Sequence, residues 1–323
     1  MTVINRRAVV TGLMALAAGR AAADQVWPDR TITLVHGFPP GGPVDTAARI
    51  VADGLSTRLG QRVVVDARPG ATGTTAAAQV ARAAPDGYTL MNIPASYTAT
   101  AAMYRKLPYR STEDFSMISM TVEYPIVLAT RADHSIRTLA DLVRLAKSQN
   151  MPLQYGTAGV GSLQHLALEL FAKMANIRLQ HIPYRGGPQA IADLLGKRID
   201  LVPDPPTALV EHIQAGQLRA VAITSANRFF GLPDVPTIAE VGFPNYAVAG
   251  FQGIIGPAGL PPIIVSRLNK EIAAVLADQG VVEQLRKLGN SPRPSSPDEL
   301  RASIAADIAR WSDIVSDAGI ERI

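Results

Sequence analysis

Two glycine-rich turns are the parts of this sequence best suited to bind a small anion. Residues 37–45 read GFPPGGPVD and residues 156–162 read GTAGVGS, and each turn lies between a predicted strand and a predicted helix. The first N–H groups of a helix lack partners within the helix and carry partial positive charge. Glycines just before them allow an anion to come close. A turn without a ligand can use the same residues, so each turn alone leaves both interpretations open.

Neither turn matches a nucleotide-binding motif. The stretch GTAGVG differs in spacing from the G-x-G-x-x-G of dinucleotide-binding folds, and PPGGPVDT lacks the lysine of a phosphate-binding loop. A carboxylate satisfies the same N–H donors as a phosphate. The turns therefore argue against a nucleotide, and the anion need not be a phosphate.

Two polar groups near the turns have simple structural explanations. Asp45 lies in the first turn of its predicted helix, where an acidic residue favours the helix dipole, and it can pair with Arg49 one turn later. His165 follows Ser162 closely, which suggests a Ser–His pair. However, no G-x-S-x-G motif is present, and Ser162 is better explained as the N-cap of its helix. We expect a binding function rather than catalysis.

Composition excludes several other functions. The sequence contains no cysteine, so thiol catalysis and thiolate metal sites are excluded. Its five histidines show no H-E-x-x-H spacing, and we expect no metal or other cofactor. There is no basic run with interleaved aromatic residues, which argues against a nucleic-acid partner.

The N-terminus has the pattern of an export signal. Arg6 and Arg7 precede an apolar stretch, and the small residues 21–23 form a cleavage site before Asp24. The sequence therefore predicts a signal peptide over residues 1–23, cleaved near Ala23, and an exported mature chain. Both Sec and twin-arginine export fit this pattern. Without its three arginines the formal net charge falls from +4 to +1, so the basic character belongs mainly to the signal.

Short apolar stretches alternate with helical patterns along the rest of the chain. Three strand–helix units occupy about the first 90 mature residues, which is typical of an α/β fold with parallel strands. The same pattern repeats in the middle of the sequence. The chain is predicted to cross between two lobes near residues 119–127 and again near 248–253, with a cleft between the lobes.

The sequence resembles the Bug family, the periplasmic receptors of tripartite tricarboxylate transporters. The matching stretches include FPPGGPVDTAAR, RPGATGTTAAAQVARAAPDGYTL, LPYRSTEDF, GTAGVGSLQHLALELF, HIPYRGGPQAIADLL, AGQLRAVAITSANR, LPDVPTIAEVGFP and GPAGLP, and together they span essentially residues 24–323. The resemblance implies a two-lobed, type II periplasmic binding protein in which each lobe is a mostly parallel sheet flanked by helices. It closes like a flytrap on a solute. The lobes are expected at residues 24–123 with 250–323, and at residues 124–249.

The resemblance also implies the site and the partners. In the family the two glycine-rich loops bind one carboxylate through main-chain groups and bridging waters, and further residues line the pocket. The corresponding residues here are Phe38, Pro40, Gly41, Gly42, Asp45, Ser96, Thr157, Ala158, Gly161, Ser162, His165, Tyr184, Asp204 and Phe251. The implied partners are a small carboxylate and the membrane subunits of such a transporter, with the receptor itself a monomer.

This sequence departs from the family pattern in the distal pocket. Prolines surround Asp204 in DLVPDPP, and Phe251 stands where many relatives have tryptophan. If Asp204 lines the pocket without a compensating charge, a second ligand carboxylate is disfavoured by like-charge repulsion. We therefore expect a monocarboxylate or an amino acid. Two alternatives remain open: a periplasmic enzyme that uses Ser162 and His165, and a sensory receptor subunit.

Overall fold

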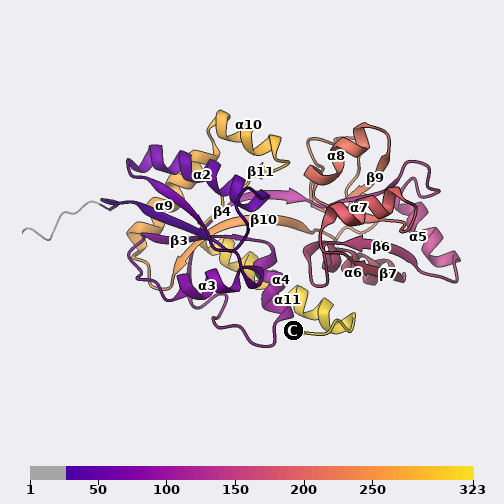
Figure 1. The fold of residues 1–323 in the computed structure, drawn as a ribbon, viewed down its shortest axis with the longest axis horizontal. Coiled ribbons are helices and arrows are strands. Elements are labelled where there is room, and N and C mark those ends of the chain that lie inside the picture. The colour runs from indigo at the N-terminus through magenta and orange to yellow at the C-terminus, as the bar shows by residue number, and fades with distance from the viewer. Residues whose placement is uncertain (1–26) are drawn as a thin grey trace, which may run out of the picture.

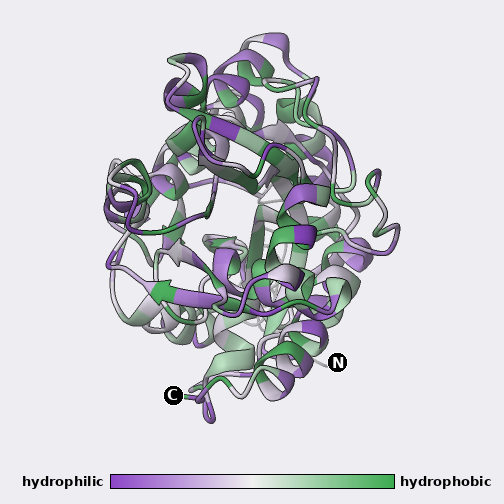
Figure 2. Ribbon diagram, turned by 90° about the vertical axis from the view of Figure 1, so that its right-hand side faces the viewer, coloured by the Kyte–Doolittle hydropathy of each residue, from purple (hydrophilic) through white to green (hydrophobic). Residues whose placement is uncertain are grey.

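The protein is described here by a computed structural model, in which residues 27–323 are placed. The predicted signal peptide lies outside these residues. The chain forms two α/β lobes that lie side by side and are joined by strands in the middle (Figure 1). In the end-on view, hydrophobic and hydrophilic residues alternate along the helices, as expected for amphipathic helices that pack on a sheet (Figure 2).

The first lobe is built on a six-stranded sheet in the order β11–β4–β10–β3–β1–β2. Three of its strands are parallel: β1 (Ile32–His36), β2 (Val63–Ala67) and β3 (Thr89–Pro94). Helices begin just after these strands, namely α2 (Pro43–Leu59), the short 3₁₀ helix η1 (Ala71–Gly73), α3 (Thr74–Ala81) and α4 (Ser96–Met103). The loops before these helices therefore lie at one edge of the sheet, where ligands of such folds bind.

Two long strands connect the lobes. Strand β4 (Phe115–Pro125) leads out of the first lobe, and β10 (Ala249–Pro257) leads back beside it. They are antiparallel to each other, and β10 is also antiparallel to β3. The expectation of a mostly parallel sheet needs correction for these strands. A strand that leaves a lobe and a neighbouring strand that returns must run in opposite directions.

The second lobe contains two small sheets joined by a bridge between Tyr155 and Leu201. One sheet is parallel, β6 (Leu153–Thr157) with β7 (Leu179–Pro183), and the other is antiparallel, in the order β8 (Val202–Asp204), β5 (Val127–Arg131) and β9 (Leu218–Ile223). Its helices are α5 (Leu139–Ser148), α6 (Leu163–Ala175), α7 (Gly187–Leu195) and α8 (Pro206–Gln214).

The C-terminal part completes the first lobe. It contains α9 (Pro262–Leu276), α10 (Gln279–Lys287), the short strand β11 (Ser291–Pro292) and α11 (Pro297–Asp317). Helix α11 also contacts the second lobe, because Arg310 donates to the carbonyl of Ala247 and Asp317 pairs with Lys173. The chain therefore ends near the junction of the lobes (Figure 1).

Several helix ends follow directly from short sequence patterns. Capping boxes begin α5, between Thr138 and Asp141, and α11, between Ser296 and Glu299. Gly60 ends α2 in the left-handed conformation. Within residues 227–246, all of which the structure describes, no helix or strand is assigned apart from an isolated bridge between Thr237 and Ile223. Among the placed residues, no helix has both the length and the apolar character to span a membrane.

Candidate ligand-binding site

A cavity of about 420 Å³ lies between the lobes. Both lobes and the C-terminal segment contribute to its wall, which is formed by Phe38, Pro43, Val44, Thr72, Pro94, Ala95, Ser96, Thr100, Met103, Tyr104, Tyr124, Ala158, Val160, Gly161, Ser162, Leu163, Gln164, Pro205, Pro206, Thr207, Gln252, Leu288, Gly289, Asn290 and Ile323. None of these wall residues carries a charged side chain. A small ligand fits this cavity. The negative charge of an anionic ligand would have to be balanced by groups other than Lys or Arg side chains.

Four helices begin at the cavity wall and supply that balance. They are α2 at Pro43 and α4 at Ser96 from the first lobe, and α6 at Leu163 and α8 at Pro206 from the second. Each helix start carries unpaired N–H groups and the positive end of the helix dipole. Backbone groups from both lobes can therefore stabilise an anion placed between them.

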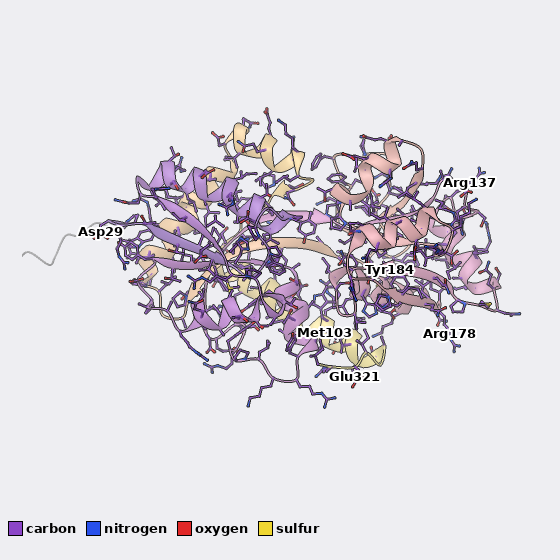
Figure 3. All side chains as sticks on the ribbon, viewed as in Figure 1. Asp29, Met103, Arg137, Arg178, Tyr184 and Glu321 are labelled. Atoms are coloured by element: carbon purple, nitrogen blue, oxygen red, sulfur yellow. The ribbon has the colours of Figure 1, made fainter. Side chains whose placement is uncertain are left out.

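The lobes touch on two sides of the cavity. A methyl group on Gly161 would lie 2.8 Å from Met103 Cγ, so Met103 of α4 packs directly on the second lobe's glycine turn. Figure 3 shows Met103 at the junction of the lobes. A methyl group on Gly289 would lie 3.4 Å from Thr207 Cγ2. These contacts enclose the cavity between them.

Asp45 holds the first glycine turn in place. Its Oδ2 accepts hydrogen bonds from Gly41 N at 2.9 Å and from Arg49 Nε at 2.8 Å, and its Oδ1 lies 2.9 Å from His36 Nε2. Phe38 N–H donates to His36 Nδ1, so the ring proton is on Nε2 and points at Asp45. Bonding to Arg49 holds the pKa of Asp45 well below its usual range. The carboxylate is buried behind the turn, where it positions the turn rather than lining the cavity.

The substitution Asp45→Asn should lower the free energy of unfolding by about 2 kcal/mol near neutral pH and weaken ligand binding, because His36 and Gly41 lose a charged partner. The loss should shrink as the pH falls below about 4, since the stabilisation from a depressed pKa is present only while the carboxylate is ionised. Urea unfolding at several pH values measures this. An equal loss at neutral and acidic pH would contradict it.

A third glycine turn, residues 68–75, supports the first from behind and was not predicted to belong to the site. A methyl group on Gly37 would lie 2.2 Å from Gly73 Cα, so the two turns meet backbone to backbone. Thr72 from this turn lines the cavity with φ +56°, a left-handed conformation rarely adopted by β-branched residues. Such strain is found at sites held by the surrounding structure. Its sequence signal is the motif GATG at residues 70–73, which places two glycines just before α3.

Two stacked histidines hold the second lobe's glycine turn. The rings of His165 and His181 lie 3.8 Å apart between centroids. His165 Nδ1 accepts from Gly161 N–H at 3.1 Å, and His181 Nε2 lies 2.6 Å from the hydroxyl of Thr157. Burial lowers the pKa of His165 to about 3, with a further contribution from His181, and burial lowers that of His181 to about 4. Both rings are therefore neutral near pH 7, which leaves His165 Nδ1 free to accept the Gly161 bond.

The proposed Ser–His pair does not form. Ser162 Oγ accepts from the backbone N–H of His165, which confirms Ser162 as the N-cap of α6. The His165 ring points to Gly161 instead, and its Nε2 lies 3.8 Å from Glu169. Ser162 is thus a capping residue in the cavity wall.

The structure brings some of the predicted site residues to the cavity and places others behind it. Five line it: Phe38, Ser96, Ala158, Gly161 and Ser162. Within the placed part of the chain, the others lie outside the lining set, namely Pro40, Gly41, Gly42, Asp45, Thr157, His165, Tyr184, Asp204 and Phe251. Pro40, Gly41 and Gly42 belong to the turn between two lining residues, so they adjoin the cavity directly.

Tyr184 and Phe251 were expected at the pocket but contact other parts of the protein. Tyr184 packs on Gly156, and its hydroxyl donates to Asp193 of α7 at 2.8 Å. Phe251 lines a separate hollow on β10, together with Val248. Because side chains alternate along a strand, the next residue, Gln252, faces the cavity instead.

Asp204 lies just behind the wall. It is 6% exposed, and its Oδ1 accepts from Gln164 Nε2 at 3.2 Å. Burial raises the pKa of Asp204 to about 6. Tyr124, in the wall nearby, has its pKa raised to about 12 by burial and by the Asp204 charge, so its hydroxyl stays protonated.

Polar wall residues that the sequence reasoning missed include Thr100, Tyr124, Gln164, Thr207, Gln252 and Asn290. Alternation along β10 was the available signal for Gln252. Gln164 stands next to His165, which was singled out instead. The others come from segments far apart in the sequence and carried no local signal.

A sequence profile described as "Tripartite tricarboxylate transporter family receptor" matches residues 47–320. The chain belongs to this receptor family. Bordetella pertussis "Protein BugT" is 34% identical over 320 residues, covering 98% of each chain. The predicted resemblance to the Bug family is therefore confirmed.

Solved structures of similar proteins support the same conclusion. This family member resembles "periplasmic binding protein BugD" with a TM-score of 0.73 and 32% identity, covering 92% of this chain and 100% of that one. A Rhodopseudomonas palustris protein "with adipate" gives a TM-score of 0.77 and 35% identity, covering 92% and 100%. Another, "with bound malate", gives 0.72 and 32%, covering 90% and 100%. The two-lobed periplasmic binding protein fold is thus confirmed.

Proposed function

We propose that this receptor binds a small carboxylate between its lobes and delivers it to a tripartite tricarboxylate-type transporter. The observation that carries the proposal is the cavity itself: its wall lacks charged side chains, yet helices from both lobes begin there. Such a wall stabilises one carboxylate through backbone N–H groups. The adipate and malate named for similar proteins support a ligand of this class.

We further propose that the protein acts in the periplasm as a monomer, after cleavage of its signal near Ala23. Residues 24–123 with 250–323 and residues 124–249 would move as two bodies, and ligand would favour the closed arrangement by its contacts with both. N-terminal sequencing of protein from the periplasmic fraction tests the cleavage site. Transport rather than sensing is favoured by the family's description.

A binding role also fits better than catalysis. The only predicted nucleophile–base pair, Ser162 and His165, is used to cap α6 and to hold Gly161. Incubation of purified protein with a bound carboxylate should give stoichiometric binding without product. Turnover that disappears in His165→Ala would instead support an enzyme.

The substitution Gly42→Val should weaken carboxylate binding about tenfold or more, because two branched methyl groups would stand at the start of α2. The fold should tolerate the change. Gly42 has φ −76°, and a methyl group there would lie 3.4 Å from Pro39 O. Calorimetric titration with a bound acid measures the effect.

Gly186→Val is the matched control. Gly186 is also an N-cap glycine without a side-chain cap, but it precedes α7, which does not contribute to the described cavity wall. Unchanged affinity in folded Gly42→Val would contradict the proposed site. Native mass spectrometry of freshly purified wild-type protein, searching for a co-purified small acid, would identify the ligand directly.

A further inference from the structure

Two glutamines in the cavity wall present opposite ends of their amides. Gln252 Oε1 accepts from Asn92 Nδ2 at 2.8 Å, which orients the amide with its oxygen toward Asn92. Its Nε2 lies 3.4 Å from Pro43 O, at the start of α2. An amide has two N–H donors, and the second remains for a ligand. Gln252 therefore adds a donor beside the first lobe's helix start, where a ligand carboxylate is proposed to bind.

Gln164 is oriented the other way. Its Nε2 donates to Asp204 Oδ1, and an ionised carboxylate can only accept hydrogen bonds. Burial raises the pKa of Asp204 to about 6, so the carboxylate is ionised at about pH 8. One N–H of Gln164 is thereby directed at Asp204, which orients the amide so that its oxygen points away from the carboxylate and can accept from a ligand.

Asp204 is itself held in position. A methyl group on Gly187 would lie 2.1 Å from Asp204 Oδ2, so the carboxylate packs closely against the start of α7. This contact leaves the Asp204 side chain little room to turn away from Gln164. The neighbouring Tyr124 hydroxyl can either donate or accept and does not select between ligands.

From this geometry we infer that the ligand is asymmetric: a carboxylate at one end, and at the other a hydrogen-bond donor, hydroxyl or amino, that binds Gln164 Oε1. Gln164 is the specificity-determining residue and Asp204 its positioning residue. The inference rests on the proposed carboxylate-binding function and deepens it. A second carboxylate would bring acceptor oxygens against the Gln164 oxygen and a negative charge toward Asp204, both unfavourable. The expected preference against a dicarboxylate distinguishes this protein from the similar protein whose structure contains adipate, a dicarboxylate.

The test compares matched acids on three purified proteins by calorimetric titration at about pH 8. The probes are pentanoate, 5-hydroxypentanoate, 5-aminopentanoate and glutarate, with their homologues one carbon shorter and longer. For the wild type, a hydroxy or amino acid should bind about tenfold or more tighter than the plain acid and the dicarboxylate of equal length.

The variant Asp204→Asn should reverse the preference. Asparagine can donate to Gln164 Oε1, which lets the amide turn and present its NH₂ group to the cavity. Dicarboxylates should then gain about tenfold in affinity while donor-bearing acids lose a similar factor. Gln164→Leu, which has neither donor nor acceptor, should lose the preference for donors without gaining dicarboxylates. Asp234→Asn removes an equal charge from an exposed position of the second lobe and should change nothing.

Different results would contradict the asymmetric ligand and the proposed receptor function. Dicarboxylates that bind the wild type as tightly as the hydroxy and amino acids would overturn the inference and leave the receptor function standing. So would an unchanged preference in Asp204→Asn whose circular dichroism matches the wild type. If no acid of the set binds the wild type, the proposed function fails, and the inference with it.

Discussion

Replacing Gly37 by alanine should lower the free energy of unfolding by about 3 kcal/mol and abolish tight ligand binding. The added methyl would lie 2.2 Å from Gly73 Cα and 3.1 Å from Gly73 C, both backbone atoms that cannot turn aside. The first and third glycine turns must then separate. Phe38 and Thr72, which line the cavity from these two turns, would move with them.

Urea unfolding and calorimetric titration measure the two effects. Gly186→Ala is the control, because Gly186 has extended backbone that any residue adopts and a methyl there would lie 3.8 Å from Pro188 Cδ. It should change stability by less than about 1 kcal/mol. If Gly37→Ala retains wild-type stability and affinity, the close packing of the two turns is not needed for the site.

The second large effect concerns stability and pH at Asp204. Its pKa rises by burial from 3.8 to about 6, so the ionised side chain destabilises the folded state by roughly 3 kcal/mol, at about 1.4 kcal/mol per unit. The folded wild type holds a proton between these pH values that the unfolded chain has released. Its stability therefore falls as the pH rises through this window and stays low above it.

Asp204→Asn removes this pH dependence. The variant without ligand should be more stable than the wild type by about 1–2 kcal/mol near pH 8, after allowance for the weaker hydrogen bond to Gln164, and the difference should vanish near pH 4. Thermal or urea unfolding across this range measures it. A variant less stable than the wild type near pH 8 would show that the buried charge is compensated by the surrounding structure. Asp234→Asn should show no such pH-dependent difference.

At Asp204, stability and ligand selectivity are expected to oppose each other. The buried Asp204 carboxylate destabilises the fold but fixes the orientation of Gln164. A residue that lowers stability while positioning a binding group is common at functional sites. Near pH 8, Asp204→Asn should therefore be more stable than the wild type and should lose the preference for donor-bearing acids over dicarboxylates.

Local sequence patterns determined much of this protein. The alternation of apolar stretches with helical periodicity indicated the α/β class, and the capping residues Thr138, Ser162 and Ser296 stand at three helix starts. These features depend on residues a few positions apart, so they can be read without a fold. The stretches shared with the receptor family then indicated the two lobes, which the family profile and the similar structures confirm.

The composition of the site was decided by tertiary structure. The face that β10 turns toward the cavity carries Gln252 rather than Phe251, and the approach of Gly37 to Gly73 brought a third turn into the site. Asp204 was expected in the cavity wall, but it lies behind Gln164, which is 40 residues away in the chain. The acceptor offered to a ligand is an amide oxygen whose orientation depends on that contact. The spacing of residues in the sequence does not predict this contact between Gln164 and Asp204, because long-range packing decides which of the two side chains lines the cavity.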